Sequence, residues 1–473
     1  MGIFSSKALH ERIELFTVSI FVTLYIVAAS AVALHRYWQF DIFWLDYGIL
    51  DETIWKLSRF QMPVVINLAP PQGNIVWGDH LNPSMMFTAP VYWLGTRNEI
   101  TLVAQVVSVA LSAVVAYIIS RSIIKSPLAR VALIVSYLGY VGIQNALITD
   151  IHNIVFALLP FMLSVWAVNN RRLILYWIFF LITLGFQENM AGLGVGIGLY
   201  LALRKDKMIR IAIFTIIVSI AWGVLATRVI MPGVSGHPYF YSPSLPTVWH
   251  EWLTRFIYPP ELKLKSILAT YATFGFLPVA SLSILPMVTE HYLERFVLNL
   301  AGTRWDLGLH YNAPLSPIMF LGSLEVLEQI QKHRLLKRLI PWWGVTTIIT
   351  VFFLHRFYLH GPLLLATHSV FYEQTGKHEF LRDFEKRIPT DGLIMTQNNI
   401  AAHFTHHQTM LLRPDVEKYK PRYVALDLRP GQNGNNFFPL TEEEAKQIAN
   451  ELWQNPNYSL MYTSGSLYLF ARR

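Results

Sequence analysis

Long apolar runs alternate with short polar segments over the first three quarters of the chain. Runs of the length that crosses a bilayer, roughly 17 to 25 residues, occupy residues 15–34, 99–120, 131–149 and 208–230. Shorter apolar runs, which need tilt or neighbouring helices to span, occupy residues 153–169, 173–187, 190–203, 313–328 and 341–356. The stretch 266–290 is broken by Pro278 and Pro286, so it either spans imperfectly or turns back on itself. The pattern predicts a mainly α-helical, polytopic transmembrane bundle of about eleven spans.

After His360 the pattern changes to short alternating runs that are typical of strands. These runs are "DGLIMTQ", "QTMLLRP", "RYVALDLRP", "YSLMYT" and "SLYLFAR". The segment "TEEEAKQIANELWQN" predicts a helix, with Thr441 and Glu444 as its capping box. Ser464 and Gly465 predict a tight hairpin between the last two strands. We therefore predict a membrane domain over 1–360, with a large first outer loop at 35–98, and a small α/β domain over 361–473.

Composition supports this division. Of the 473 residues, 53% are hydrophobic and only 14% are charged, against about 25% charged in a soluble protein. Residues 371–473 carry 12 basic and 12 acidic side chains, so the whole net charge of +8 belongs to the first 370 residues. Basic residues occur in short loops rather than on one face, which excludes a nucleic-acid-binding protein. The absence of cysteine excludes disulfides and thiolate chemistry.

The distribution of basic residues predicts the orientation. Fifteen of the 26 basic residues of the first 370 lie at Lys7, at Arg12 and in four short loops, at 121–130, 171–172, 204–210 and 332–338. Positively charged loops stay cytoplasmic. We therefore expect a multi-pass protein of a prokaryotic cytoplasmic membrane, with a cytoplasmic N-terminus, an uncleaved first span and an extracytoplasmic C-terminal domain.

Acidic residues gather on the opposite, outer side, beside histidines and amides. They recur in five segments, "LDYGILDE" (45–52), "GDHLNP" (78–83), "TDIHN" (149–153), "QEN" (187–189) and "WDLGLHYN" (305–312). Single acids there can simply cap helices, as Asp79 or Asp150 would. Five such clusters on one side indicate a shared functional cavity, because ionisable groups near membrane depth are costly.

The order of these segments, together with "DIHNIVFALLPFML", "QENMAGLGVGIGLYL" and "HYNAPLSPIMFLGSLE", resembles a family of prokaryotic polytopic proteins known as domain of unknown function 2079. The resemblance covers residues 40 to 330 and continues loosely into the tail. Where that family usually has lysine, glutamate and aspartate, this chain has Gln187, Glu188 and Asn189. The family in turn looks like a distant branch of the GT-C glycosyltransferases, which take sugars from polyprenyl-phosphate donors.

That resemblance implies an integral-membrane transferase with an aspartate in the first outer loop that serves the acceptor or a metal. Asp46 stands at the matching position, with Asp79, His80 and Pro83 behind it. A polyprenyl phosphate is already a good leaving group, so one carboxylate that polarises the acceptor is sufficient. Asp46 is our candidate general base, because Trp44 and Leu45 would partly desolvate it. Asp51 is the second candidate, although the first turn of a helix is also an ordinary place for an acid.

The remaining candidates serve the lipid phosphate, the sugar or a metal. Phosphate and substrate binding are assigned to Asp150, His152, Glu188, Arg304, His310 and Tyr311. Arginine suits phosphate, but Arg304 beside Trp305 could equally be an interfacial anchor. Asp46, Asp79 and His80 could hold Mg²⁺ or Mn²⁺, and His80 with His152 could hold Zn²⁺.

Two further segments have alternative interpretations. The glycines of "GLGVGIG" (192–198) could open a slot for a prenyl chain or simply allow close helix packing. The aromatic loop 231–265 suits sugars, or else contains an interfacial helix at "VWHEWLTRFIY". As a whole the chain is predicted to transfer a sugar from a polyprenyl-phosphate donor to an extracytoplasmic glycan, lipid or protein. A transporter or flippase for a lipid-linked glycan is the alternative, and a non-catalytic assembly subunit is a third.

Overall fold

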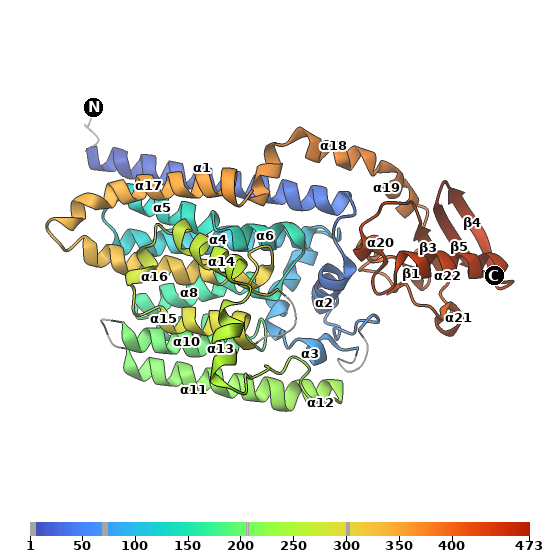
Figure 1. Cartoon of the computed structure of the whole chain (residues 1–473), viewed down its shortest axis with the longest axis horizontal. Coiled ribbons are helices and arrows are strands. Elements are labelled where there is room, and N and C mark those ends of the chain that lie inside the picture. Colours follow the sequence, from blue (N-terminus) through green and yellow to red (C-terminus); the bar gives the residue numbers. More distant parts are fainter. Residues whose placement is uncertain (1–5, 69–73, 205, 207, 299–302) are drawn as a thin grey trace.

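The computed structural model describes residues 6–68, 74–204, 206, 208–298 and 303–473. A bundle of roughly aligned helices forms most of the molecule, and a small sheet lies at one end of it (Figure 1). The helices of this bundle and at its margin are α1 (Ser6–Trp38), α4 (Ile100–Ile123), α5 (Pro127–Leu138), α6 (Val141–Thr149), α7 (Asn153–Phe156), α8 (Leu158–Asn169), α9 (Leu173–Leu184), α10 (Met190–Leu203), α11 (Ile209–Leu225), α12 (Met231–Ser235), α13 (Trp249–Ile257), α14 (Pro260–Thr273), α15 (Leu285–Tyr292), α16 (Leu315–Ile330) and α17 (Ile340–Phe353). The fold is mainly helical, as the apolar pattern predicts.

Three described helices are long and apolar enough to cross a membrane by themselves. They are Glu11–Trp38, Ile100–Ile123 and Ile209–Ser235, the last continuing α11 through a π turn into α12. A fourth candidate is the pair α5 and α6, which is bent by 43°. Helices of 12 to 14 residues, such as α8, α9 and α10, rise only about 18 to 21 Å and need tilt to cross about 30 Å of hydrocarbon. The number of eleven spans therefore stays a prediction. The stretch 266–290 does break at its prolines, into α14, a 3₁₀ turn at Leu277–Ala280 and α15.

Two of the basic loops meet at the end of the bundle that lies away from the sheet. The α4–α5 and α16–α17 connections lie near the start of α1 (Figure 1). Lys125 N donates to Gln331 Oε1 at 3.1 Å, and Gln331 Nε2 donates to the Ile123 carbonyl at 2.7 Å. In the same region the Arg130 guanidinium binds both carboxylate oxygens of Glu14. A buried ion pair thus joins α1 to α5 at this end.

The described residues between α1 and α4 form a compact layer at the sheet end of the bundle, which we call the outer layer. It holds a π turn (Trp44–Gly48), α2 (Ile49–Ser58), α3 (Val76–Asp79) and two 3₁₀ turns (Pro83–Phe87 and Ala89–Trp93). This layer carries the first two acidic segments, and it lies between the bundle and the sheet (Figure 1).

The C-terminal part contains a five-stranded sheet with helices on both faces. Its elements are α18 (Ser369–Lys377), α19 (Glu379–Glu385), β1 (Ile394–Thr396), α20 (Asn398–Ala401), β2 (Thr409–Leu411), α21 (Val416–Tyr419), β3 (Tyr423–Asp427), α22 (Glu442–Gln454), β4 (Tyr458–Ser464) and β5 (Leu467–Arg472). The strand order is β2-β1-β3-β5-β4, with β1 parallel to β2 and β3, and β5 antiparallel to β3 and β4.

Side chains of β3 alternate between the two faces, as the period of two requires. Val424 and Leu426 pack in the cluster that contains α22, while Tyr423 and Ala425 pack in the cluster that contains α19. The capping box of Thr441 and Glu444 is present, and β4 and β5 form the expected hairpin, with Gly465 at a φ of +58°. The sequence thus predicted all five strands and the long helix correctly.

Candidate functional site

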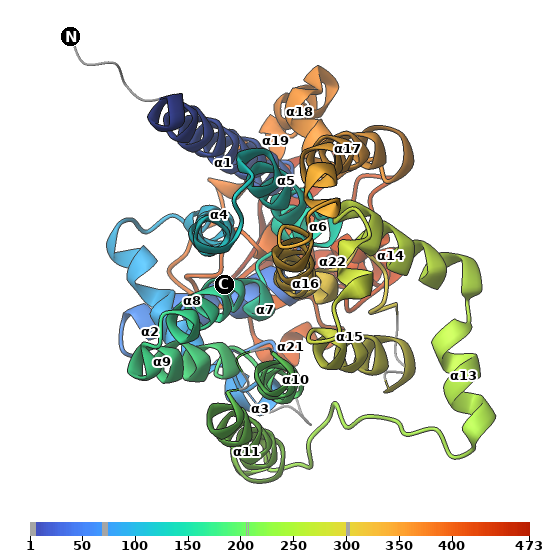
Figure 2. The ribbon, with the colours of Figure 1, turned by 90° about the vertical axis from the view of Figure 1, so that its left-hand side faces the viewer.

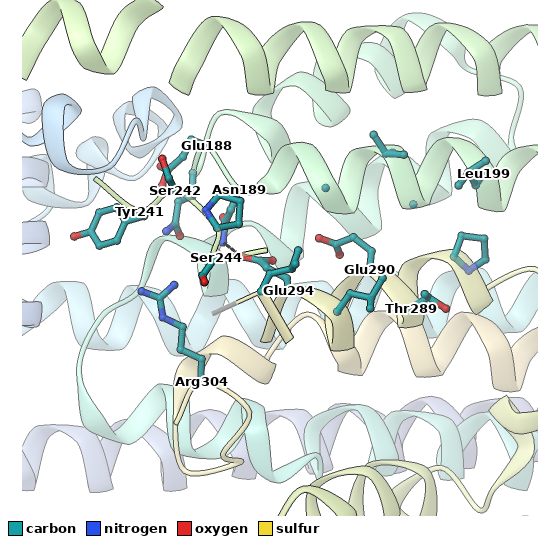
Figure 3. A pocket seen from close by; sticks show the side chains of 18 of the residues that line it. Glu188, Asn189, Leu199, Tyr241, Ser242, Ser244, Thr289, Glu290, Glu294 and Arg304 are labelled. Carbon is teal, nitrogen blue, oxygen red and sulfur yellow. Dashed lines mark hydrogen bonds between the residues drawn. The ribbon is translucent and has the colours of Figure 1, made fainter. Parts of the chain in front are cut away.

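A cavity of about 1050 Å³ lies between α10 and α15, beneath the loop that follows α12. Its outer end is polar and its inner part is apolar, with Arg304 and Tyr241 at one end and Leu199 towards the other (Figure 3). The residues that line it include His80, Glu188, Asn189, Gly192, Val195, Gly196, Leu199, Tyr239, Tyr241, Ser244, Leu282, Leu285, Glu290, Leu293, Glu294 and Arg304. The cavity is therefore amphipathic along its length.

A hydrogen-bonded group from three chain segments forms the polar end. His80 Nδ1 lies 2.9 Å from Glu188 Oε1, and Tyr239 donates to the same oxygen at 3.1 Å. The Tyr241 hydroxyl donates to Asp79 Oδ1 at 2.7 Å, and its ring stacks on the His80 imidazole with centroids 4.6 Å apart. The first outer layer, the start of α10 and the loop after α12 are thereby joined at one point.

Electrostatics in this group favour a protonated histidine. Burial alone would lower the pKa of His80, but the adjacent Glu188 carboxylate raises it to about 9. Burial alone would raise the pKa of Glu188, but the charge and hydrogen bonds of His80 and Tyr239 hold it below its usual range. The His80 side chain remains 28% exposed to solvent. It therefore presents a cationic face at the polar end.

Arg304 supplies a second cation. Its guanidinium carbon lies 5.0 Å from the ring centroid of Tyr311 and 5.9 Å from that of Tyr241, and Figure 3 shows its head directed towards the cavity. Among the described residues it makes no ion pair with a carboxylate. A guanidinium that contacts aromatic rings and pairs with no carboxylate of the described residues can bind an anionic ligand.

Asp46 lies at the centre of the π turn Trp44–Gly48, a type of turn that is frequent at functional sites. A Cβ atom at Gly48 would lie 2.3 Å from Trp44 Cδ1, so this turn requires glycine. The Asp46 side chain stays exposed although protein surrounds it. Desolvation raises the pKa of Asp46, while the nearby charges of His80 and Asp79 lower and raise it respectively. Asp46 thus lies within electrostatic reach of the polar end.

Three other predicted residues form a stack behind this end. The His152 and His310 rings are parallel with centroids 3.6 Å apart, and His310 lies 4.0 Å from Tyr311. Asp150 is buried near Asp46, and its Oδ1 has no hydrogen-bond partner among the described residues. The structure therefore brings nine of the ten predicted site residues into one neighbourhood.

Asp51 is the tenth and lies elsewhere, at the contact between the outer layer and the C-terminal part. It is fully buried and accepts hydrogen bonds from Thr101 Oγ1 and Thr405 Oγ1, both at 2.6 Å, and from the Tyr92 hydroxyl. Thr101 and Tyr92 donate to Oδ1 and Thr405 donates to Oδ2, and His406 Nε2 lies 3.2 Å from Oδ2. With both oxygens occupied by protein donors, Asp51 is placed to hold two parts of the chain together.

The inner part of the cavity depends on the alternating glycines. A Cβ at Gly196 would lie 2.9 Å from Met287 Cγ and 3.0 Å from Met287 Cα, while one at Gly198 would lie 2.5 Å from Ile216. Successive glycines therefore allow α10 to approach α15 on one side and α11 on the other, which confirms the packing interpretation. Apolar side chains of both helices complete an open slot.

The sequence interpretation did not single out four polar residues of this cavity, namely Tyr239, Tyr241, Glu290 and Glu294. Asn189 Nδ2 donates to Glu294 Oε1 at 3.2 Å (Figure 3). Arg295 pairs with the same oxygen at 2.7 Å. Two acids within the apolar stretch "LPMVTEHYLERF" were the signal that would have identified the glutamates, because such acids are rarely placed in a membrane protein without a task.

That Asp46, Asp79 and His80 hold a metal ion stays a prediction. Within the described residues no group of three or more His, Asp or Glu side chains is placed to hold a metal ion. Asp79 accepts from Tyr241, His80 pairs with Glu188 and His152 stacks on His310. Asp79 and His80 thus each have a protein partner in the described part of the chain.

The chain is similar to known proteins in its fold and in its sequence family. The crystal structure of ArnT from Cupriavidus metallidurans bound to undecaprenyl phosphate matches with a TM-score of 0.58 and 10% identity, covering 96% of this chain and 97% of that one. The chain therefore shares the overall fold of ArnT. Comparison with curated proteins gives no match. A family model described as "predicted membrane protein (DUF2079)" matches residues 36–463, and the chain belongs to this family.

Proposed function

We propose that the protein transfers a sugar from a polyprenyl-phosphate donor to an acceptor on the outer side of the membrane. The observation that carries the proposal is the amphipathic cavity between α10 and α15, with two cations at its polar end and an apolar slot behind them. An isoprenoid phosphate has the same division into an anionic head and an apolar chain. The shared fold with ArnT, which was crystallised bound to undecaprenyl phosphate, supports the same donor class.

The polar end would hold the phosphate of the donor. Arg304 offers a planar set of donors without a competing acid among the described residues, and the His80 imidazolium adds a second positive charge. Hydrogen bonds between ionised groups are the strong ones in a site with restricted water. These cations would neutralise charge that develops on the phosphate as the sugar departs.

Asp46 would act on the acceptor. An acceptor hydroxyl attacks the anomeric carbon, a new carbon–oxygen bond forms, and the bond between that carbon and the phosphate oxygen breaks. The acceptor proton passes to the Asp46 carboxylate, and the electron pair leaves with polyprenyl phosphate. Partial desolvation by neighbouring protein raises the pKa of Asp46, although its side chain stays solvent-accessible, and makes it a better base than an aspartate in free solution.

The test is donor consumption by the purified full-length protein in lipid vesicles. A set of undecaprenyl-phosphate hexoses and pentoses is incubated with an envelope extract as acceptor, and mass spectrometry follows the release of undecaprenyl phosphate. Wild-type protein is expected to consume at least one donor, and Asp46→Asn is expected to lose this turnover. Asp41→Asn is the matched control, because Asp41 lies in the same segment and pairs with Arg36 at 2.9 Å.

Two outcomes would overturn the proposal. Equal donor consumption by wild type and Asp46→Asn would remove the assigned base. Movement of the lipid-linked sugars between leaflets without their consumption would contradict a transferase and favour the transporter.

A further inference from the structure

Helix α13 is an unusual element because none of its residues is buried. It stands at the margin of the molecule, outside the aligned helices (Figure 2). Its apolar strip, defined as Trp249, Leu253 and Ile257, has exposed fractions of 80%, 54% and 47%. The four-residue spacing places these side chains on one face of the helix. The polar residues of the helix fall outside this strip, so α13 is strongly amphipathic.

The other side of α13 is fastened to the rim of the cavity. Arg255 donates to the Ser244 carbonyl at 2.8 Å and to the Val297 carbonyl at 3.3 Å. Ser244 N in turn donates to the Leu298 carbonyl at 2.9 Å, and both Ser244 and Leu298 line the cavity. Lys263 Nζ donates to the Phe296 carbonyl at 3.0 Å. The position of α13 is therefore coupled to that of the cavity rim through these hydrogen bonds.

The exposed residues next to the strip indicate that lipid covers it. The exposed apolar surface continues through Tyr258 into α14, where Leu262, Leu264 and Leu268 are each about half exposed. In a membrane protein such a continuous apolar surface contacts lipid. The charge of Arg255 is engaged by Glu251 at 2.9 Å and by backbone carbonyls, so this cation is directed at protein and not at lipid headgroups.

We propose that α13 lies flat in the outer leaflet, with the strip of Trp249, Leu253 and Ile257 embedded below the headgroups, and thereby fixes the rim of the cavity at the membrane surface. The partner is the lipid bilayer itself, bound through apolar insertion rather than charge. This proposal depends on the membrane location and the predicted orientation of the chain and not on the proposed reaction.

The absence of cysteine from the chain allows a clean test with single-cysteine labels. Leu253→Cys reports on the strip, and Thr254→Cys, one residue further round the same helix, is the matched control. Each full-length variant is labelled with an environment-sensitive fluorophore and reconstituted at low density in phosphatidylcholine vesicles. The quenchers are a lipid carrying a nitroxide near its headgroup and aqueous iodide.

The label at 253 is expected to show a blue-shifted emission, quenching by the nitroxide lipid and protection from iodide, with no change at high salt. The label at 254 is expected to show the opposite quenching. Hydrogen exchange at 293–298 should also rise in Leu253→Ser but not in Thr254→Ser. Equal iodide quenching at both positions would overturn the proposal. So would protection at 253 that disappears as the protein is diluted among vesicles, because that result would assign the strip to a second copy of the chain.

Discussion

The contact around Asp51 allows a prediction that depends on structure alone. Asp51 lies on α2, and Thr405 lies in the C-terminal part, 354 residues away, yet the Thr405 hydroxyl donates to the buried carboxylate at 2.6 Å. Thr405→Val keeps the shape of the side chain and removes this donor, together with the oxygen that accepts from Asn98 Nδ2 at 2.7 Å. The affected oxygen then has no hydrogen-bond donor among the described residues, because His406 Nε2, 3.2 Å away, makes no hydrogen bond to it. The substitution should therefore weaken the attachment of the C-terminal part without disturbing its core.

A hydrogen bond to a charged, buried acceptor contributes about 1.5 to 3 kcal/mol. If Thr405→Val lowers the free energy of local opening by that amount, amide hydrogen exchange in residues 398–411 should accelerate about 10- to 150-fold. Exchange measured by mass spectrometry on the full-length protein in nanodiscs gives this factor directly. Thr463→Val, at an exposed position of β4, is the matched control and should leave the same peptides unchanged.

Unchanged exchange of residues 398–411 in Thr405→Val would refute the assignment of Asp51 to this attachment. An equal acceleration in Thr463→Val would refute it as well, because the effect would then not be local to the carboxylate.

Two further predictions concern the cavity. The pKa of His80 is raised from 6.5 to about 9, so its pairing with Glu188 should add up to about 3 kcal/mol to the free energy of unfolding below pH 6.5. This contribution should be lost as the pH rises through 9. Thermal unfolding from pH 6 to 10 should show the loss in wild type and a flatter profile in Glu188→Gln. Gly196→Ala should destabilise the protein by about 1 to 3 kcal/mol, because the added methyl would clash with the Met287 backbone. Gly233→Ala is the control, since a Cβ there has no heavy atom within 4 Å, and it should unfold at the wild-type temperature or above.

The sequence predicted the broad architecture because strong periodic signals are local. Apolar runs gave the helices, and the switch to a period of two after His360 gave the sheet. The span count stays a prediction for a physical reason, since α9 and α10 are too short to cross a bilayer without tilt. Tilt depends on packing between helices, which one sequence does not specify.

The site was predictable in its membership but not in its pairings. Acids and histidines at outer helix ends indicated a shared cavity, and His80, Glu188 and Arg304 do line it. Asp51 instead accepts a hydrogen bond from Thr405, which is distant in the sequence. No local sequence pattern predicts this contact. Tyr239 and Tyr241 were hidden in an aromatic loop whose position over the cavity arises only in the folded chain.

The central claim is that one isoprenoid phosphate occupies the whole cavity, with its head at Arg304 and its chain beside Leu199. The most direct measurement is the affinity of the full-length protein for undecaprenyl phosphate, determined by native mass spectrometry from nanodiscs. Arg304→Ala should weaken binding about tenfold or more by removing a charged donor, and Leu199→Trp should weaken it by filling the slot. Ile213→Trp, on the exposed face of α11, should bind as wild type does. Wild-type affinity in both Arg304→Ala and Leu199→Trp would contradict the claim.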